Sequence, residues 1–137
     1  MKIVIDTNGL ISGIFWEGNE SKILKACKIG NLTNYISPDT IKEFERVLSY
    51  KKFKFTLAEI RSALETVLSF SIVVIPHIKL DVIKDDPLDD IFLECALTAN
   101  VEYIISGDKH LLDLGEYKGI MIMNGARFLR EYKEIIG

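Results

Sequence analysis

The chain opens with MKIVID (residues 1–6), in which three consecutive apolar residues precede an acid. A short run that is apolar on both faces is typical of a central strand in a parallel sheet. The run is too short to be the apolar core of a secretion signal. We therefore expect Lys2–Ile5 to form a central strand that ends at Asp6, in a cytoplasmic protein.

Strand and helix patterns alternate along the rest of the sequence. Further strands are predicted at residues 34–36, 72–75, 102–106 and 120–123. Helices are predicted at residues 20–29, 38–49, 57–69, 89–99 and from 125 onward, with N-caps at Asn19, Ser37, Thr56 and Asn124. Such alternation implies a parallel sheet with helices on both faces, and the right-handed crossover rule favours strand order 3-2-1-4-5. The prediction is a single α/β domain over residues 1–137 with a five-stranded parallel sheet.

Composition narrows the classes of function. No apolar run approaches the roughly 20 residues that a membrane helix requires. The net charge of -3 argues against a protein that binds nucleic acid mainly through a broad basic face, but it is compatible with an acidic site that meets phosphate through metal ions. The two cysteines, Cys27 and Cys95, lie far apart in helical patterns, and we expect both to be buried and reduced.

Acids follow two of the predicted strands. Asp6 ends the first strand, and Asp108 comes just after the strand over residues 102–106. If these strands are neighbours, their carboxyl ends lie about 5 Å apart. The point between them is where the strand order reverses, and ligands tend to bind at such a position. Phe15 and Trp16 are expected in a loop beside this edge.

Two helices are expected to bring further acids to the same edge, because their N-termini return to the carboxyl ends of the strands. Asp89 lies in the first turn of its predicted helix, although its neighbour Asp90 could serve instead. Glu43 lies roughly 7–8 Å along its helix, and its side chain can reach back toward the N-terminus.

Four carboxylates in one pocket would repel one another unless a cation neutralised them. Oxygen ligands without a His or Cys partner suit Mg²⁺ or Mn²⁺ rather than zinc. An ion held in this way can activate a water and stabilise the leaving oxygen of a phosphodiester. Each acid also has a structural interpretation of its own, as a strand end, a solvated helix residue, an N-cap or a turn residue. Together they favour metal-assisted phosphodiester hydrolysis by Asp6, Glu43, Asp89 and Asp108.

Four blocks of sequence, in order, resemble the PIN domain family. They are IVIDTN (3–8), SPDTIKEFERVL (37–48), DPLDDIFLECA (86–96) and YIISGDKHLL (103–112). The resemblance covers nearly the whole chain, and it places the same four acids at the family's catalytic and metal-ligating positions. The subgroup it matches best is the VapC-like toxins of toxin–antitoxin pairs.

The resemblance implies an endonuclease that cleaves RNA with Mg²⁺ or Mn²⁺, is inhibited by a small antitoxin protein, and forms homodimers or higher oligomers. Asn8 and Ser106 match positions that support the acids. His110 stands where many relatives carry a further acid, which leaves a second metal position open. The alternative function is a non-catalytic PIN module that binds RNA or a protein partner.

One further segment allows two interpretations. SYKKFKF (residues 49–55) interleaves three lysines with three aromatic residues. Lysines can contact phosphates and aromatic rings can stack on unpaired bases, so the segment could clamp RNA. It could equally be a helix junction with its rings buried and its lysines in water.

Overall fold

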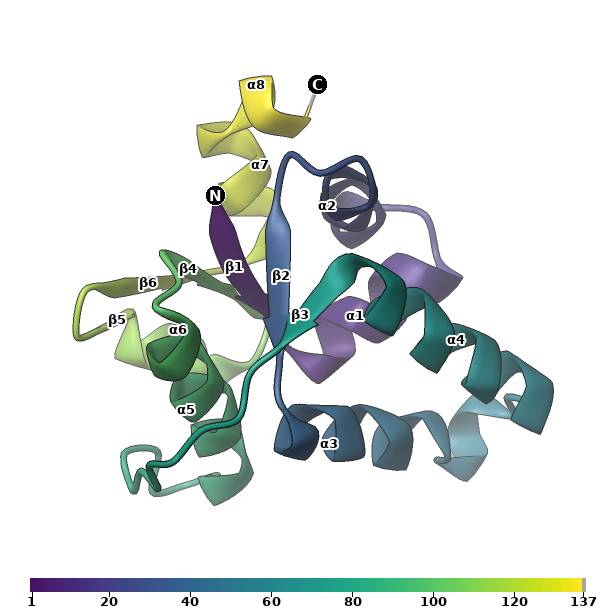
Figure 1. Ribbon diagram of the computed structural model, residues 1–137, viewed down its shortest axis with the longest axis horizontal. Helices are drawn as coiled ribbons and strands as arrows, with labels where there is room; N and C mark the ends of the chain where they lie inside the picture. Colours follow the sequence, from purple (N-terminus) through teal and green to yellow (C-terminus); the bar gives the residue numbers. More distant parts are fainter. Residues whose placement is uncertain (137) are drawn as a thin grey trace.

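The computed structural model describes residues 1–136, with side chains through residue 134. Its centre is a sheet with strand order β3-β2-β1-β4-β6-β5 (Figure 1). The strands are β1 (Lys2–Ile5), β2 (Thr33–Ile36), β3 (Ser71–Val73), β4 (Tyr103–Ile105), β5 (Glu116–Tyr117) and β6 (Ile120–Met123). The apolar strand β1 is central and pairs in parallel with both β2 and β4, as predicted.

The predicted α/β class and the order of the five parallel strands are confirmed, but the number of strands is wrong. The predicted fifth strand is β6, and β5 adds a sixth strand that pairs antiparallel with β6 at the sheet edge. Lys118 and Gly119 join the two strands with φ angles of 49° and 86°, as a two-residue hairpin turn requires. A strand of two residues is too short to show an alternation pattern, so the sequence could not reveal it.

Helices flank the sheet throughout. They are α1 (Thr7–Phe15), α2 (Asn19–Lys28), α3 (Pro38–Leu48), α4 (Leu57–Phe70), α5 (Asp90–Ala99), α6 (Lys109–Leu114), α7 (Gly125–Glu131) and α8 (Lys133–Ile136), with 3₁₀ turns η1 (Lys51–Phe53) and η2 (Pro87–Asp89). The loop expected at Phe15 and Trp16 is wrong, because Phe15 ends α1 and Trp16 is its C-cap. Glycine has a low helix propensity, and Gly9 and Gly13 therefore made α1 difficult to predict from the sequence. Gly13 is needed there, since a Cβ atom would lie 2.6 Å from Leu24 of α2.

Three of the four predicted N-caps are confirmed. The side chains of Ser37, Thr56 and Asn124 each accept a hydrogen bond from a backbone N–H in the first turn of α3, α4 and α7. The prediction for Asn19 is wrong, because Gly18 is the cap and Asn19 is already helical. Asn124 caps α7, and the short helix α8 follows it.

Two apolar cores lie on opposite faces of the sheet. Residues along a strand alternate between faces, so Ile3 and Ile5 of β1 pack with α1, α2, α3, α4 and α7, whereas Val4 packs with α5 and α6. One cysteine belongs to each core, and both are free and buried, as expected. Burial raises the pKa of Cys27 and of Cys95 to about 12, so neither thiol ionises readily.

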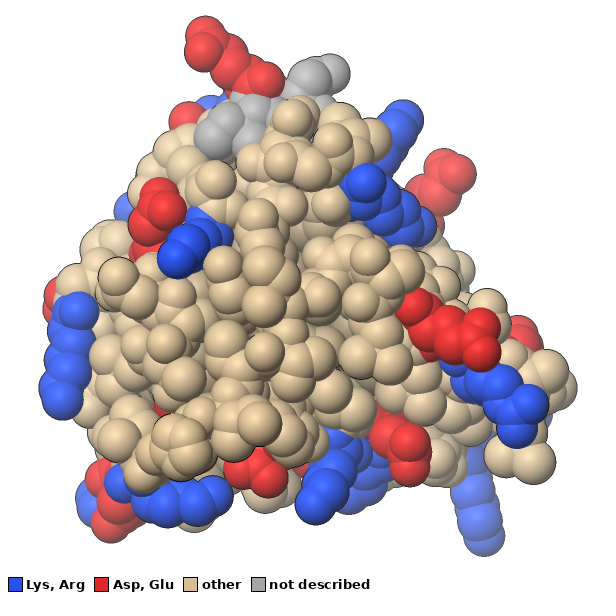
Figure 2. All heavy atoms as spheres, viewed as in Figure 1, with Lys and Arg blue, Asp and Glu red and all other residues tan. Residues whose placement is uncertain are grey.

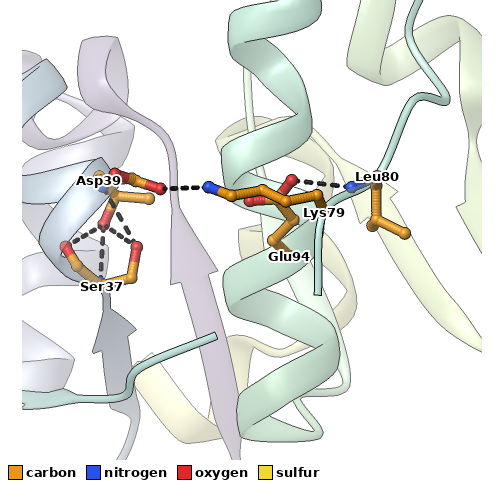
Figure 3. Close-up of polar contacts among 6 residues, drawn as sticks. Ser37, Asp39, Lys79, Leu80 and Glu94 are labelled. Carbon is orange, nitrogen blue, oxygen red and sulfur yellow. Dashed lines mark hydrogen bonds and ion pairs between the residues drawn. The ribbon is translucent and has the colours of Figure 1, made fainter. Parts of the chain in front are cut away.

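The long connection between β3 and η2 is attached to both α3 and α5. Glu94 of α5, which is buried, accepts a hydrogen bond from the Leu80 backbone N–H at 2.9 Å. Lys79 forms an ion pair at 3.4 Å with Asp39, in the first turn of α3 (Figure 3). These contacts tie the start of α3 and the middle of α5 to one segment.

The outer face around β3 is apolar and largely free of charge. Figure 2 shows Lys, Arg, Asp and Glu mainly around the rim of this face and few at its centre. Ile72 and Val73 of β3, with Ile75 and Ile78 beyond it, are all exposed there. Among residues 1–136, none of the helices combines the length and the apolar character needed to cross a bilayer.

Candidate active site

Asp6 and Asp108 lie at the carboxyl ends of adjacent strands, as predicted. β1 and β4 pair in register to Ile5 and Ile105, and the Asp6 backbone N–H continues the ladder by donating to the Ile105 carbonyl at 3.0 Å. Each acid also begins a helix. Asp6 accepts from the Gly9 N–H at 2.8 Å, and Asp108 accepts from the His110 N–H at 2.8 Å. Both carboxylates are therefore fixed by strand and helix together.

Ser106 connects these two acids. Its hydroxyl is buried, donates to Asp6 Oδ2 at 2.6 Å and accepts from the Asp108 backbone N–H at 2.9 Å. Ser106, which was expected to support the acids, therefore links Asp6 to Asp108 through its hydroxyl. Asn8 is the second residue of α1, is exposed, and lines a cleft together with Asp6 and Asp108.

Asp89, rather than Asp90, faces the cleft. Both side chains are buried, at 8% and 3% exposure. Asp90 accepts hydrogen bonds from the backbone N–H groups of Val82 and Ile83, both at 3.1 Å, and so holds the long connection. Asp89 precedes α5, but its side chain makes no capping hydrogen bond within the described chain. Its Oδ2 atom is buried and has no hydrogen-bond partner among the described residues.

Glu43 reaches the cleft but already has a cationic partner. Its two oxygens accept from Arg46, at 2.7 Å from Nη2 and 3.1 Å from Nε. The remaining guanidinium nitrogen donates to the Tyr50 hydroxyl at 2.6 Å. Arg46 is half exposed, whereas Glu43 is largely covered, so the guanidinium can move aside more easily than the carboxylate.

All four predicted acids line one cleft of about 230 Å³. The residues come from four separate elements and are Asp6, Glu43, Asp89 and Asp108. Arg46, Tyr50 and Lys52 also line it. Each interpretation of the 49–55 segment describes part of it. Tyr50 and Lys52 line the cleft. The rings of Phe53 and Phe55 stack against each other, and Phe55 also stacks against Phe15.

Two acids of the cleft, Asp6 and Asp89, have a raised pKa. Burial is the main cause for Asp6, and repulsion from Asp108 acts in the same direction, while the hydrogen bond from Ser106 opposes them. For Asp89, burial comes first and the adjacent Asp108 second, and together with Asp86 and Asp6 they raise its pKa to about 8. Asp6 and Asp89 therefore lie where a negative charge is disfavoured, and a divalent cation would relieve this.

Two further residues, which the sequence did not single out as ligands, form a tight group with Asp89 alone of the four predicted acids. Asp86, Asp89 and His110 each offer one potential ligand atom, and these three atoms lie within 4.8 Å of one another. The three-residue spacing between Asp86 and Asp89 is the one local signal for this group. His110 stands where many members of the resembled family carry an acid.

The donor set fits a divalent cation. Carboxylate oxygens dominate it, which suits Mg²⁺ or Mn²⁺, and the unpartnered Asp89 oxygen points to a missing positive partner, since buried polar atoms are normally satisfied.

Residues 2–110 match a family model described as the PIN domain. The matched segment includes every acid of the cleft. A comparison with curated proteins finds no match.

Proposed function

The chain belongs to the PIN domain family, and from this we propose that it is a metal-dependent endoribonuclease acting through Asp6, Glu43, Asp89 and Asp108. Members of this family are generally metal-dependent nucleases. The observation that carries the proposal is that four acids from separate elements line one cleft. One of them, Asp89, has a buried oxygen without a hydrogen-bond partner among the described residues.

Each residue has a role that its position supports. Asp6, Asp89 and Asp108 offer oxygens from the strand ends and the start of α5, and Ser106 keeps the first and last of these in place. These residues would hold Mg²⁺ or Mn²⁺, which would lower the pKa of a water and offset the charge of the phosphate. Glu43 would become a further ligand if its ion pair with Arg46 broke. The Arg46 guanidinium could then bind a phosphate oxygen.

RNA is the proposed substrate because basic and aromatic side chains line the cleft together with the acids. Arg46 and Lys52 offer cations for the backbone, and Tyr50 offers a ring on which an unpaired base can stack. Single-stranded RNA suits such a small, local basic surface, given the net charge of -3.

We further propose that the protein is the toxin of a toxin–antitoxin pair and acts as a homodimer or higher oligomer that a small antitoxin protein inhibits. The resemblance of its four sequence blocks to VapC-like toxins supports the biological role. The exposed apolar side chains around β3 are of the kind that a protein partner covers.

A cleavage assay with matched variants tests the proposed activity. Purified protein is incubated with labelled single-stranded RNA in EDTA, Mg²⁺ or Mn²⁺, beside the Asp108→Asn and Asp113→Asn variants. Asp113 lies on the same helix but is exposed and outside the cleft. We expect metal-dependent cleavage by the parent and by Asp113→Asn, and a rate at least about 100-fold lower for Asp108→Asn, since even residues that only support a metal ligand typically cost 10–100-fold.

The other outcomes each overturn part of the proposal. Equal rates for Asp108→Asn and the parent, or cleavage in EDTA, would indicate a contaminant or a different site. RNA binding without cleavage in either metal would favour the non-catalytic module. Faster cleavage of matched DNA would contradict the choice of RNA.

A further inference from the structure

The cluster of Asp86, Asp89 and His110 lies beside the four-acid set and shares one residue with it. Two elements supply it: Asp86 is the N-cap of η2, Asp89 ends η2, and His110 lies in the first turn of α6. One potential ligand atom from each lies within 4.8 Å of the other two. Atoms at such distances can bind one ion without a rearrangement of the backbone.

Two atoms of the cluster lack the hydrogen bonds that burial normally demands. Asp89 is 8% exposed, and its Oδ2 has no partner in the part of the chain that the structure describes. The same holds for the buried Nδ1 atom of His110. Leaving a buried polar atom unsatisfied typically costs about 1–3 kcal/mol. Two such atoms in one cluster indicate a site built for a ligand that supplies positive charge.

Neither Asp86 nor His110 belongs to the four-acid set, and the imidazole changes the chemistry. Mg²⁺ and Ca²⁺ take oxygen ligands, whereas an imidazole nitrogen suits borderline ions such as Zn²⁺, Co²⁺ and Ni²⁺. Three protein ligands that include a histidine, with an open position for water, are typical of catalytic zinc sites.

We propose that Asp86, Asp89 and His110 form a second metal position that binds a borderline transition-metal dication in preference to Mg²⁺. Asp89 bridges this position and the one between Asp6 and Asp108. The inference rests on the proposed metal-dependent function, because Asp89 serves both positions, but its test requires no RNA.

Co²⁺ is the probe, since its visible absorption reports the ligands directly. The parent protein is titrated with Co²⁺ in millimolar Mg²⁺, beside two pairs of variants. His110→Asn is matched by His77→Asn, the chain's other histidine, which is exposed, and Asp86→Asn is matched by Asp85→Asn, its exposed neighbour. Thermal melts confirm that each variant is folded.

We expect Co²⁺ to bind the parent in the presence of Mg²⁺ and to develop visible absorption. His110→Asn and Asp86→Asn should each weaken this binding by at least about tenfold, and the two controls should leave it unchanged. Parental Co²⁺ affinity in both His110→Asn and Asp86→Asn would overturn the inference, as would displacement of Co²⁺ by Mg²⁺. Because RNA cleavage is measured separately, either result leaves the nuclease proposal to its own assay.

Discussion

Replacing Asp6 with asparagine is expected to lower the rate of RNA cleavage by more than about 100-fold while the protein stays folded. Asp6 is 4% exposed and sits where β1, β4 and α1 meet. Asparagine keeps the shape and is as good an N-cap as aspartate, so the bond from Gly9 survives. It removes the negative charge that would bind a metal ion.

The measurement pairs cleavage rate with Mn²⁺ affinity and melting temperature. A suitable control is Asp39→Asn, because Asp39 lies in the first turn of α3 and its partner Lys79 is outside the cleft. Asp6→Asn should lose cleavage and Mn²⁺ affinity together, and without metal its melting temperature should be no lower than that of the parent, because burial disfavours the charged form of Asp6. Retained cleavage with lost Mn²⁺ binding would separate the metal from the reaction and contradict the mechanism.

Replacing Asp89 with asparagine is expected to abolish cleavage and yet stabilise the metal-free protein at alkaline pH. The pKa of Asp89 is raised from 3.8 to about 8, so the folded state disfavours its charged form. As the pH rises from about 4 to 8, the unfolded chain loses this proton while the folded protein retains it, and stability falls. Below pH 4 both states are protonated, and the effect is absent.

Chemical denaturation of the metal-free proteins between pH 5 and 8 measures this effect. The parent should lose stability across the range, whereas Asp89→Asn should lose less and be more stable by roughly 2 kcal/mol at pH 8, since neighbouring carboxylates share the cost. Saturating Mn²⁺ should reverse the order, because it stabilises only a protein that binds it. A parent that is as stable at pH 8 as at pH 5, without metal, would show that Asp89 is not strained by its surroundings.

Local signals were sufficient to predict much of the fold and the meeting of the acids. The apolar residues of β1 identified a central strand, and this placed Asp6 beside the end of β4, where Asp108 follows. Ser37 and Thr56 marked the starts of their helices because a side-chain cap is a local interaction.

The features that the sequence did not reveal depend on tertiary contacts or on very short elements. Helix α1 contains Gly13, and its close packing on α2 is visible only in three dimensions. The choice between Asp89 and Asp90 depended on where the backbone of residues 82 and 83 lies. The pairing of Glu43 with Arg46 is an i, i+3 contact, but its place on the wall of the cleft is not a local property.

The most direct test of the central claim is a crystal structure of the protein with Mn²⁺, in which the anomalous difference density locates the metal. We predict a peak within coordination distance of carboxylate oxygens from Asp6, Asp89 and Asp108, with Glu43 turned from Arg46 toward it. Crystals saturated with Mn²⁺ that show no peak at these three residues would contradict the claim that this cleft is a metal-dependent active site.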